Sequence, residues 1–98
     1  MPITWELGEP IAVRTLHRGD EPVTVEIGRP RPYMESEDFF CPFRITGIEL
    51  QEEGYTVGVD SVQALTLTLA RVGDVLAVSG NSYSFLGGTD LGFPRSSG

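Results

Sequence analysis

The sequence of 98 residues has no lysine, one cysteine, one histidine and no long apolar run. Each of these shortages excludes a class of protein. A single cysteine cannot form an internal disulfide, and no segment reaches the roughly 20 consecutive apolar residues of a membrane span. The first ten residues contain no basic segment followed by an apolar one. We therefore expect no secretion signal, no membrane contact and a cytoplasmic location.

Basic residues are also few. Seven arginines face fourteen acidic residues, and the formal net charge is −7. Because arginine and lysine supply most of the affinity for phosphate backbones, this balance argues against nucleic-acid binding. Positions 33–60 hold seven acidic residues and one basic residue, Arg44. Such a segment would attract a basic partner; the simpler interpretation is that the acidic balance only keeps the protein soluble.

The sequence lacks the sets of side chains that catalysis and metal binding require. Cys41 and His17 are the only residues of their kinds, and on non-neighbouring strands they would lie about 9 to 10 Å apart, too far for a nucleophile and its base. One cysteine with one histidine cannot complete a zinc site, and Glu35–Asp38 lacks the spacing of a calcium loop. We expect no enzyme activity, no cofactor and no metal site. Cys41, which lies among phenylalanines, is expected to be a buried, reduced thiol.

What the sequence does contain is one long segment with helical periodicity, residues 58–76. Asp60 can accept a hydrogen bond from the backbone N–H of Gln63, whose side chain can reach back to the Asp60 N–H, so a helix is predicted to begin at Ser61. The alternative is a strand, because leucine and threonine alternate over residues 65–69. The cap favours the helix. Its predicted buried stripe, at intervals of three and four, is Val62, Leu65, Leu69, Val72 and Leu76.

The end of this helix depends on Gly73. This glycine either caps the helix in a left-handed conformation or lies inside a helix that continues to about residue 77. In the first case residues 74–79 form a strand, and Gly80-Asn81 makes a hairpin turn into residues 83–86. We prefer the longer helix, because Leu76 continues the apolar stripe.

The remaining segments have the patterns of strands and loops. Residues 11–16 and 23–27 alternate in polarity on either side of a turn, which predicts a β-hairpin. Two prolines make residues 28–38 a loop. Residues 39–48 form a predicted third strand, which a polar turn or bulge at residues 52–54 connects to a fourth strand at 55–59.

A chain of this length makes a single domain, residues 1–98, with loosely ordered tails at 1–9 and 95–98. Antiparallel neighbours with short links form a meander with one apolar face, and that face needs a cover. The predicted fold class is therefore α+β, in two layers. An antiparallel four- to five-stranded β-meander is covered on one face by a single α-helix, about residues 61–77.

Four landmarks resemble those of a family of small bacterial proteins that is a domain of unknown function. They are GRP at 28–30, CPFRI at 41–45, GVDSVQAL at 58–65 and LGFP at 91–94. The likeness covers about residues 10–94. It implies this fold, a bacterial source and a helix that runs past Gly73. It carries over no catalytic or binding residue, because the family has no established activity.

Two functional hypotheses follow. The first is a non-enzymatic module that binds a protein partner, or a second copy of itself, through the exposed sheet face, an edge strand or the acidic segment. Its candidate contacts are Tyr33, Glu35, Glu37 and Asp38, although acidic residues in such a loop are also typical of a solvated tip. An immunity-type protein that masks a basic toxin is one version of this hypothesis.

The second hypothesis is a small-ligand-binding protein or an enzyme subunit. Its pocket would form between helix and sheet or across a homodimer, with Tyr33, Tyr55 or Tyr83 as polar contacts. Four further residues are assigned structural roles in the cap and the buried stripe: Asp60, Gln63, Leu65 and Leu69.

Overall fold

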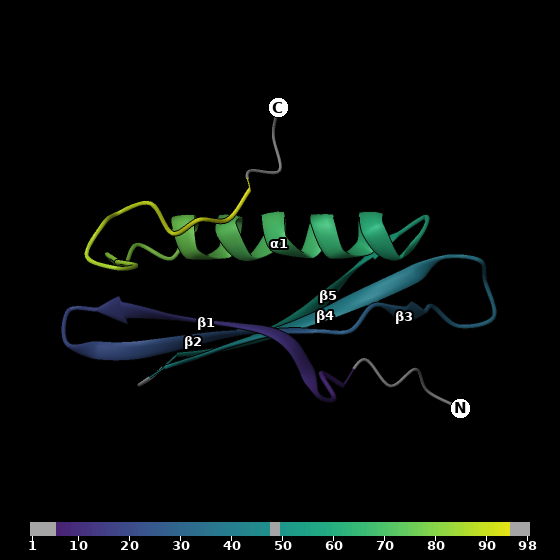
Figure 1. Cartoon of the computed structure of the whole chain (residues 1–98), viewed down its shortest axis with the longest axis horizontal. Helices are drawn as coiled ribbons and strands as arrows, with labels where there is room; N and C mark the ends of the chain where they lie inside the picture. Colours follow the sequence, from purple (N-terminus) through teal and green to yellow (C-terminus); the bar gives the residue numbers. More distant parts are fainter. Residues whose placement is uncertain (1–5, 48–49, 95–98) are drawn as a thin grey trace.

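A computed structural model describes residues 6–47 and 50–94, and it confirms the α+β fold. One antiparallel sheet forms the first layer, and a single helix lies across it as the second (Figure 1). The six elements are β1 (Pro10–Arg18), β2 (Glu21–Gly28), β3 (Arg31–Pro32), β4 (Phe39–Gly47), β5 (Leu50–Gly58) and α1 (Ser61–Val78).

The four long strands follow the order β1-β2-β4-β5 across the sheet, and every pair is antiparallel. The two-residue strand β3 pairs with the start of β4, on the side where β2 pairs further along. The loop predicted over residues 28–38 therefore contains one short paired segment. Gly19 has a φ of 65° in the predicted β1–β2 hairpin turn, a conformation that favours glycine.

The turn predicted at residues 52–54 is wrong, because β5 continues through it without a break. Its polar residues are those of an exposed edge strand rather than of a turn. Gly54 lies opposite Phe43 in the register, and a Cβ on Gly54 would come within 3.1 Å of the Phe43 ring. The glycine therefore makes room for a core aromatic side chain instead of ending the strand.

The buried core lies on the face of the sheet that α1 covers. Leu16 of β1 packs there with the odd-numbered apolar residues of the central strands, Val23, Val25, Ile27, Cys41, Phe43 and Ile45. Helix α1 contacts β4 and β5. The C-terminal segment, residues 80–94, passes beside the helix, and its Leu91 and Phe93 pack against the same core.

The buried stripe of α1 differs from the predicted one. Val62 is 70% exposed, and Leu65 and Leu69 are only half-buried against the core. Four buried positions recur every fourth residue, Ala64, Thr68, Val72 and Leu76, and Ala70 is buried as well. Thr68 belongs to this face because its hydroxyl donates a 2.7 Å hydrogen bond to the backbone oxygen of Cys41. The predicted stripe omits this buried polar side chain, because it was built from apolar residues alone.

Both ends of the helix agree with the longer of the two predicted forms. The Asp60 side chain accepts a 2.8 Å hydrogen bond from the Gln63 N–H, which confirms the cap. The Gln63 side chain accepts from the Val59 N–H at 2.7 Å, one residue before the predicted donor. Gly73 lies inside the helix, and a Cβ there would come within 3.1 Å of Phe93. This glycine allows the C-terminal segment to cross close to the helix.

By length and composition alone, α1 could also cross a membrane, since its 18 residues have a mean hydropathy of 1.3. Its core face is packed on the sheet, and a core helix of a small α+β domain satisfies the same criterion. Leu7, which precedes β1, is buried beside Gly28. The sequence also favours docking of Trp5 on the core together with Leu7, while Glu6 faces solvent, but Trp5 lies outside the described residues.

Candidate functional site

An aromatic cluster lies on the sheet face opposite α1. Tyr33 follows β3, Phe40 begins β4 and Tyr55 lies in β5. Ring centroids are 6.2 Å apart for Tyr33 and Phe40, 6.1 Å for Tyr33 and Tyr55, and 5.7 Å for Phe40 and Tyr55. Phe40 is buried, whereas Tyr55 is 37% exposed. The cluster therefore presents tyrosine rings to solvent on a face that no described helix covers.

The acidic loop of residues 33–38 is fastened directly to this cluster. The Tyr33 N–H donates to the backbone oxygen of Asp38 at 2.8 Å, and the Ser36 hydroxyl donates to the backbone oxygen of Tyr33 at 2.6 Å. Met34 has a φ of 56° and is 64% exposed. A non-glycine residue in this conformation is uncommon. The compact loop holds Met34, Glu35 and Glu37 outward, while Asp38 is half-buried.

Charges around the cluster are mostly negative. Arg44 of β4 forms a 3.0 Å ion pair with Glu26, and its neighbour on the other side is Glu53 of β5. The hydrogen bond to Glu26 raises the pKa of Arg44 above its ordinary value. Arg31 is placed over the Phe40 ring at 4.9 Å. The arginines nearest the cluster are therefore held by a glutamate or an aromatic ring.

We call half-buried Tyr33 and the exposed residues around it the acidic sheet surface: Tyr33, Met34, Glu35, Glu37, Glu53 and Tyr55. A side-chain hydrogen bond with Tyr55 raises the pKa of Tyr33 above its ordinary value. That contact links the loop to β5 across 22 positions of sequence. The candidate contacts named from the sequence include neither Met34, which carries no charge, nor Glu53, whose place beside the loop depends on the strand order.

The predicted separation of Cys41 and His17 agrees with their positions in the sheet. Cys41 faces the core, where its thiol donates to the Gly28 oxygen at 3.4 Å. Burial raises the pKa of this thiol, so the buried thiol favours an inert cysteine. His17 is on β1, and its backbone exchanges hydrogen bonds with Ser84. Within residues 6–47 and 50–94, no three metal-ligating side chains lie together.

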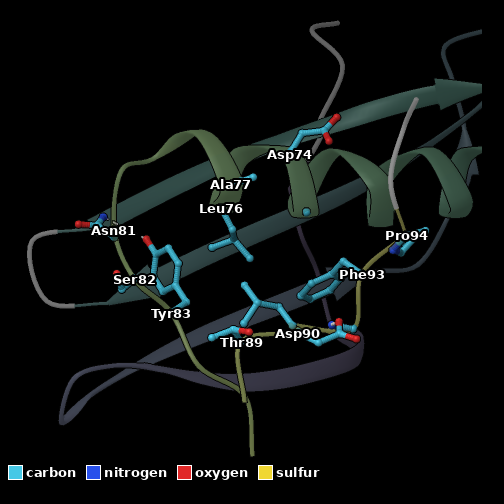
Figure 2. Close-up of a pocket in the computed structure, with 13 residues that line it drawn as sticks. Asp74, Leu76, Ala77, Asn81, Ser82, Tyr83, Thr89, Asp90, Phe93 and Pro94 are labelled. Carbon is cyan, nitrogen blue, oxygen red and sulfur yellow. Dashed lines mark hydrogen bonds between the residues drawn. The ribbon is translucent and has the colours of Figure 1, made fainter. Parts of the chain in front are cut away.

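A second candidate site is a pocket of about 630 Å³ between the C-terminal half of α1 and residues 81–94. Figure 2 shows Leu76 pointing into this space, with Tyr83 and Phe93 on opposite sides of it. Asp74 and Asp90 also line it, and none of its described lining residues is an arginine or a histidine.

Arg14 of β1 contacts the C-terminal segment that forms one side of this pocket. Its guanidinium lies 4.3 Å from the centre of the Phe85 ring and 5.3 Å from that of Phe93. It also donates a 2.9 Å hydrogen bond to the Leu91 oxygen. The pocket therefore depends on a loop that one side chain anchors to the sheet.

Fold and sites together define a small α+β protein with one helix-covered sheet face and one open, acidic and aromatic face. The chain belongs to a family described as a domain of unknown function, DUF6968, whose sequence profile matches residues 12–95. A search of curated proteins gives no match, and neither does a search of solved structures.

Proposed function

We propose that this protein is a non-enzymatic interaction module that binds a basic protein partner through the acidic sheet surface. The observation that carries the proposal is the contact between Tyr33 and Tyr55, whose ring centroids are 6.1 Å apart. This contact joins the acidic loop to the open sheet face. Because of this contact, the acidic residues surround a centre of packed aromatic rings.

The composition of this surface suits protein recognition. Tyrosine, arginine and methionine are enriched at the centres of protein interfaces, and charged side chains form the rim. Here Tyr33, Tyr55 and Met34 are the central contacts, and Glu35, Glu37 and Glu53 surround them. An arginine of the partner can stack on a tyrosine ring while it meets a carboxylate. An immunity-type protein that masks a basic toxin is one function with this chemistry.

The test uses a synthetic arginine-rich peptide and the ¹⁵N-labelled full chain. We expect chemical-shift changes to cluster at residues 33–38 and 53–57, and affinity to fall as salt is added. Glu37→Arg should weaken binding about five-fold, since reversing one exposed charge changes the interaction by roughly 1 kcal/mol.

Asp20→Arg is the matched control. It makes the same change in net charge at an exposed residue of the β1–β2 turn. If the two variants weaken binding equally, or if the shift changes fall outside the acidic sheet surface, the peptide responds only to net charge and the proposal fails.

The pocket supports a second candidate function, the binding of a small ligand. Its volume of about 630 Å³ lies in the range of ligand sites, and Tyr83 contributes a phenol to it. A thermal-shift screen of metabolites tests this function, because a ligand of the folded state raises the melting temperature. Tyr83→Phe should then reduce the shift. A screen without a hit would count against this candidate and leave the first unaffected.

A further inference from the structure

We infer that the partner of the acidic sheet surface binds as an extended strand along the outer edge of β5, with arginine or lysine at alternate positions. This inference rests on the proposed function and adds the mode of binding. Extended peptides recognised in this way obtain affinity from backbone hydrogen bonds and specificity from alternate side chains.

The edge is long and regular. β5 spans Leu50–Gly58 and pairs with β4 along its whole length, and no described strand pairs with its other side. The direction of its backbone groups follows from the ladder. The backbone N–H and C=O of His17 are bonded to Ser84, so these two groups point away from β2. The backbone groups alternate in direction along each strand, so the registers of the β1–β2, β2–β4 and β4–β5 pairs direct those of the odd-numbered residues of β5, among them Gln51, Glu53 and Val57, to the open edge.

The side chains at these positions lie on the face that α1 leaves open. Thr56, of the opposite parity, donates its hydroxyl to the Ala64 oxygen of α1 at 3.2 Å, which places the even-numbered residues under the helix. The Gln51 side chain donates to Glu53 at 3.0 Å, and both residues are exposed. A strand added here would therefore form backbone hydrogen bonds with Glu53 and place side chains beside its carboxylate.

The other edge of the sheet is closed by different means. The register of β1 shifts between Pro10 and Ala12, which marks a bulge, and Ser84 already pairs with His17 at the far end. Bulges and covering segments are the usual protections of sheet edges. Only a short stretch of β1 stays open, so β5 is the better site for strand addition.

The charge on β5 identifies the occupant. Two copies of β5 paired with each other would bring the carboxylates of Glu52 and Glu53 together with those of the second copy, and like charges on paired strands are destabilising. The same carboxylates favour a cationic strand. A residue directly opposite Glu53 has its side chain on the same face as Glu53, Tyr33 and Tyr55. That position of the partner is where arginine or lysine belongs.

The experiment uses three synthetic ten-residue peptides in which arginine and valine alternate. The first is unmodified, the second carries N-methyl groups on the arginine amides, and the third carries them on the valine amides. A peptide residue that pairs with Glu53 has its side chain on the same sheet face as Glu53 and its N–H group pointing toward β5. We therefore expect methylation of the arginine amides to weaken binding at least ten-fold and methylation of the valine amides to change it little.

Hydrogen exchange of the full chain provides the second measurement. Binding of the unmodified peptide should slow exchange at the Glu53 and Val57 amides. If both methylated peptides bind equally well and these amides exchange as in the free protein, strand addition is wrong, although shift changes at the acidic sheet surface would still support the proposed function. If the unmodified peptide does not bind there, both proposals fail.

Discussion

Replacement of Thr68 by valine tests the contact that positions the helix on the sheet. Thr68 is the fully buried polar residue of the core, and its hydroxyl donates to the backbone oxygen of Cys41 at 2.7 Å. The Thr56 hydroxyl also contacts it and bonds to the Ala64 oxygen at 3.2 Å. Valine has nearly the same shape as threonine, so the substitution removes a hydrogen bond and leaves the packing almost unchanged.

The expected loss follows from these contacts. A typical hydrogen bond contributes about 0.5 to 1.5 kcal/mol, and a buried group left without its partner adds a desolvation penalty. The Cys41 oxygen also takes part in the β4–β5 ladder, and Thr56 retains Ala64, so neither group is left wholly unsatisfied. We expect Thr68→Val to lower the free energy of unfolding by about 1 to 2 kcal/mol, or about 4 to 16 °C in melting temperature.

Urea unfolding followed by circular dichroism measures this change. Thr66→Val is the matched control, because Thr66 lies on the same helix and is exposed; its effect should be within about 0.5 kcal/mol. The double variant Thr56→Val with Thr68→Val should lose less than the sum of the single losses, because the contact between the two hydroxyls is lost in each single variant and only once in the double variant. Equal effects at Thr66 and Thr68 would refute the assignment of Thr68 to the core.

Three further predictions concern other parts of the fold. Gly58→Ala should destabilise strongly, because its Cβ would lie 2.5 Å from the Ala64 nitrogen, whereas Gly88→Ala meets nothing closer than 3.7 Å and should be tolerated in a thermal melt. Arg14→Gln should speed hydrogen exchange over residues 84–93, because it removes the cation that stacks on the aromatic rings of that segment; unchanged exchange would contradict the anchoring role. Because burial raises the pKa of Cys41, stability should be full below the unfolded thiol pKa of about 8.5 and fall as pH rises above it. Cys41→Ala should reduce this alkaline loss in a plot of the free energy of unfolding against pH.

Local signals were enough to predict the helix and the first hairpin, but not β3 or the full length of β5. The helix start follows from Asp60 and Gln63, which act within one turn, and the hairpin follows from alternation around Gly19. The buried face of the helix was partly missed, because a periodicity of apolar residues does not count Thr68. Its burial depends on the Cys41 oxygen, 27 positions away in the sequence. Gly54 was misread for a similar reason, since its role depends on the Phe43 ring across the ladder.

The candidate site was predictable only in part. The acidic loop is visible as a local concentration of carboxylates, but its link to β5 requires the strand order. Tyr33 meets Tyr55 because β3 and β5 flank the same strand, β4, on opposite sides. No local pattern indicates that neighbourhood. The same holds for the pocket, which exists because Gly73 lets the chain after the helix cross back beside it.

The two edges of the sheet show how stability and binding are connected in this chain. A free edge strand is prone to pair with other chains. β1 is protected by geometry, through its register shift and the Ser84 bridge, and this protection does not depend on the charge of a partner. β5 is protected by charge, through Glu52 and Glu53, and charge excludes only strands of the same sign. An edge protected in this way stays open to strands of the opposite charge, so under the proposed mode of binding the residues that prevent self-pairing are also those that select a basic strand.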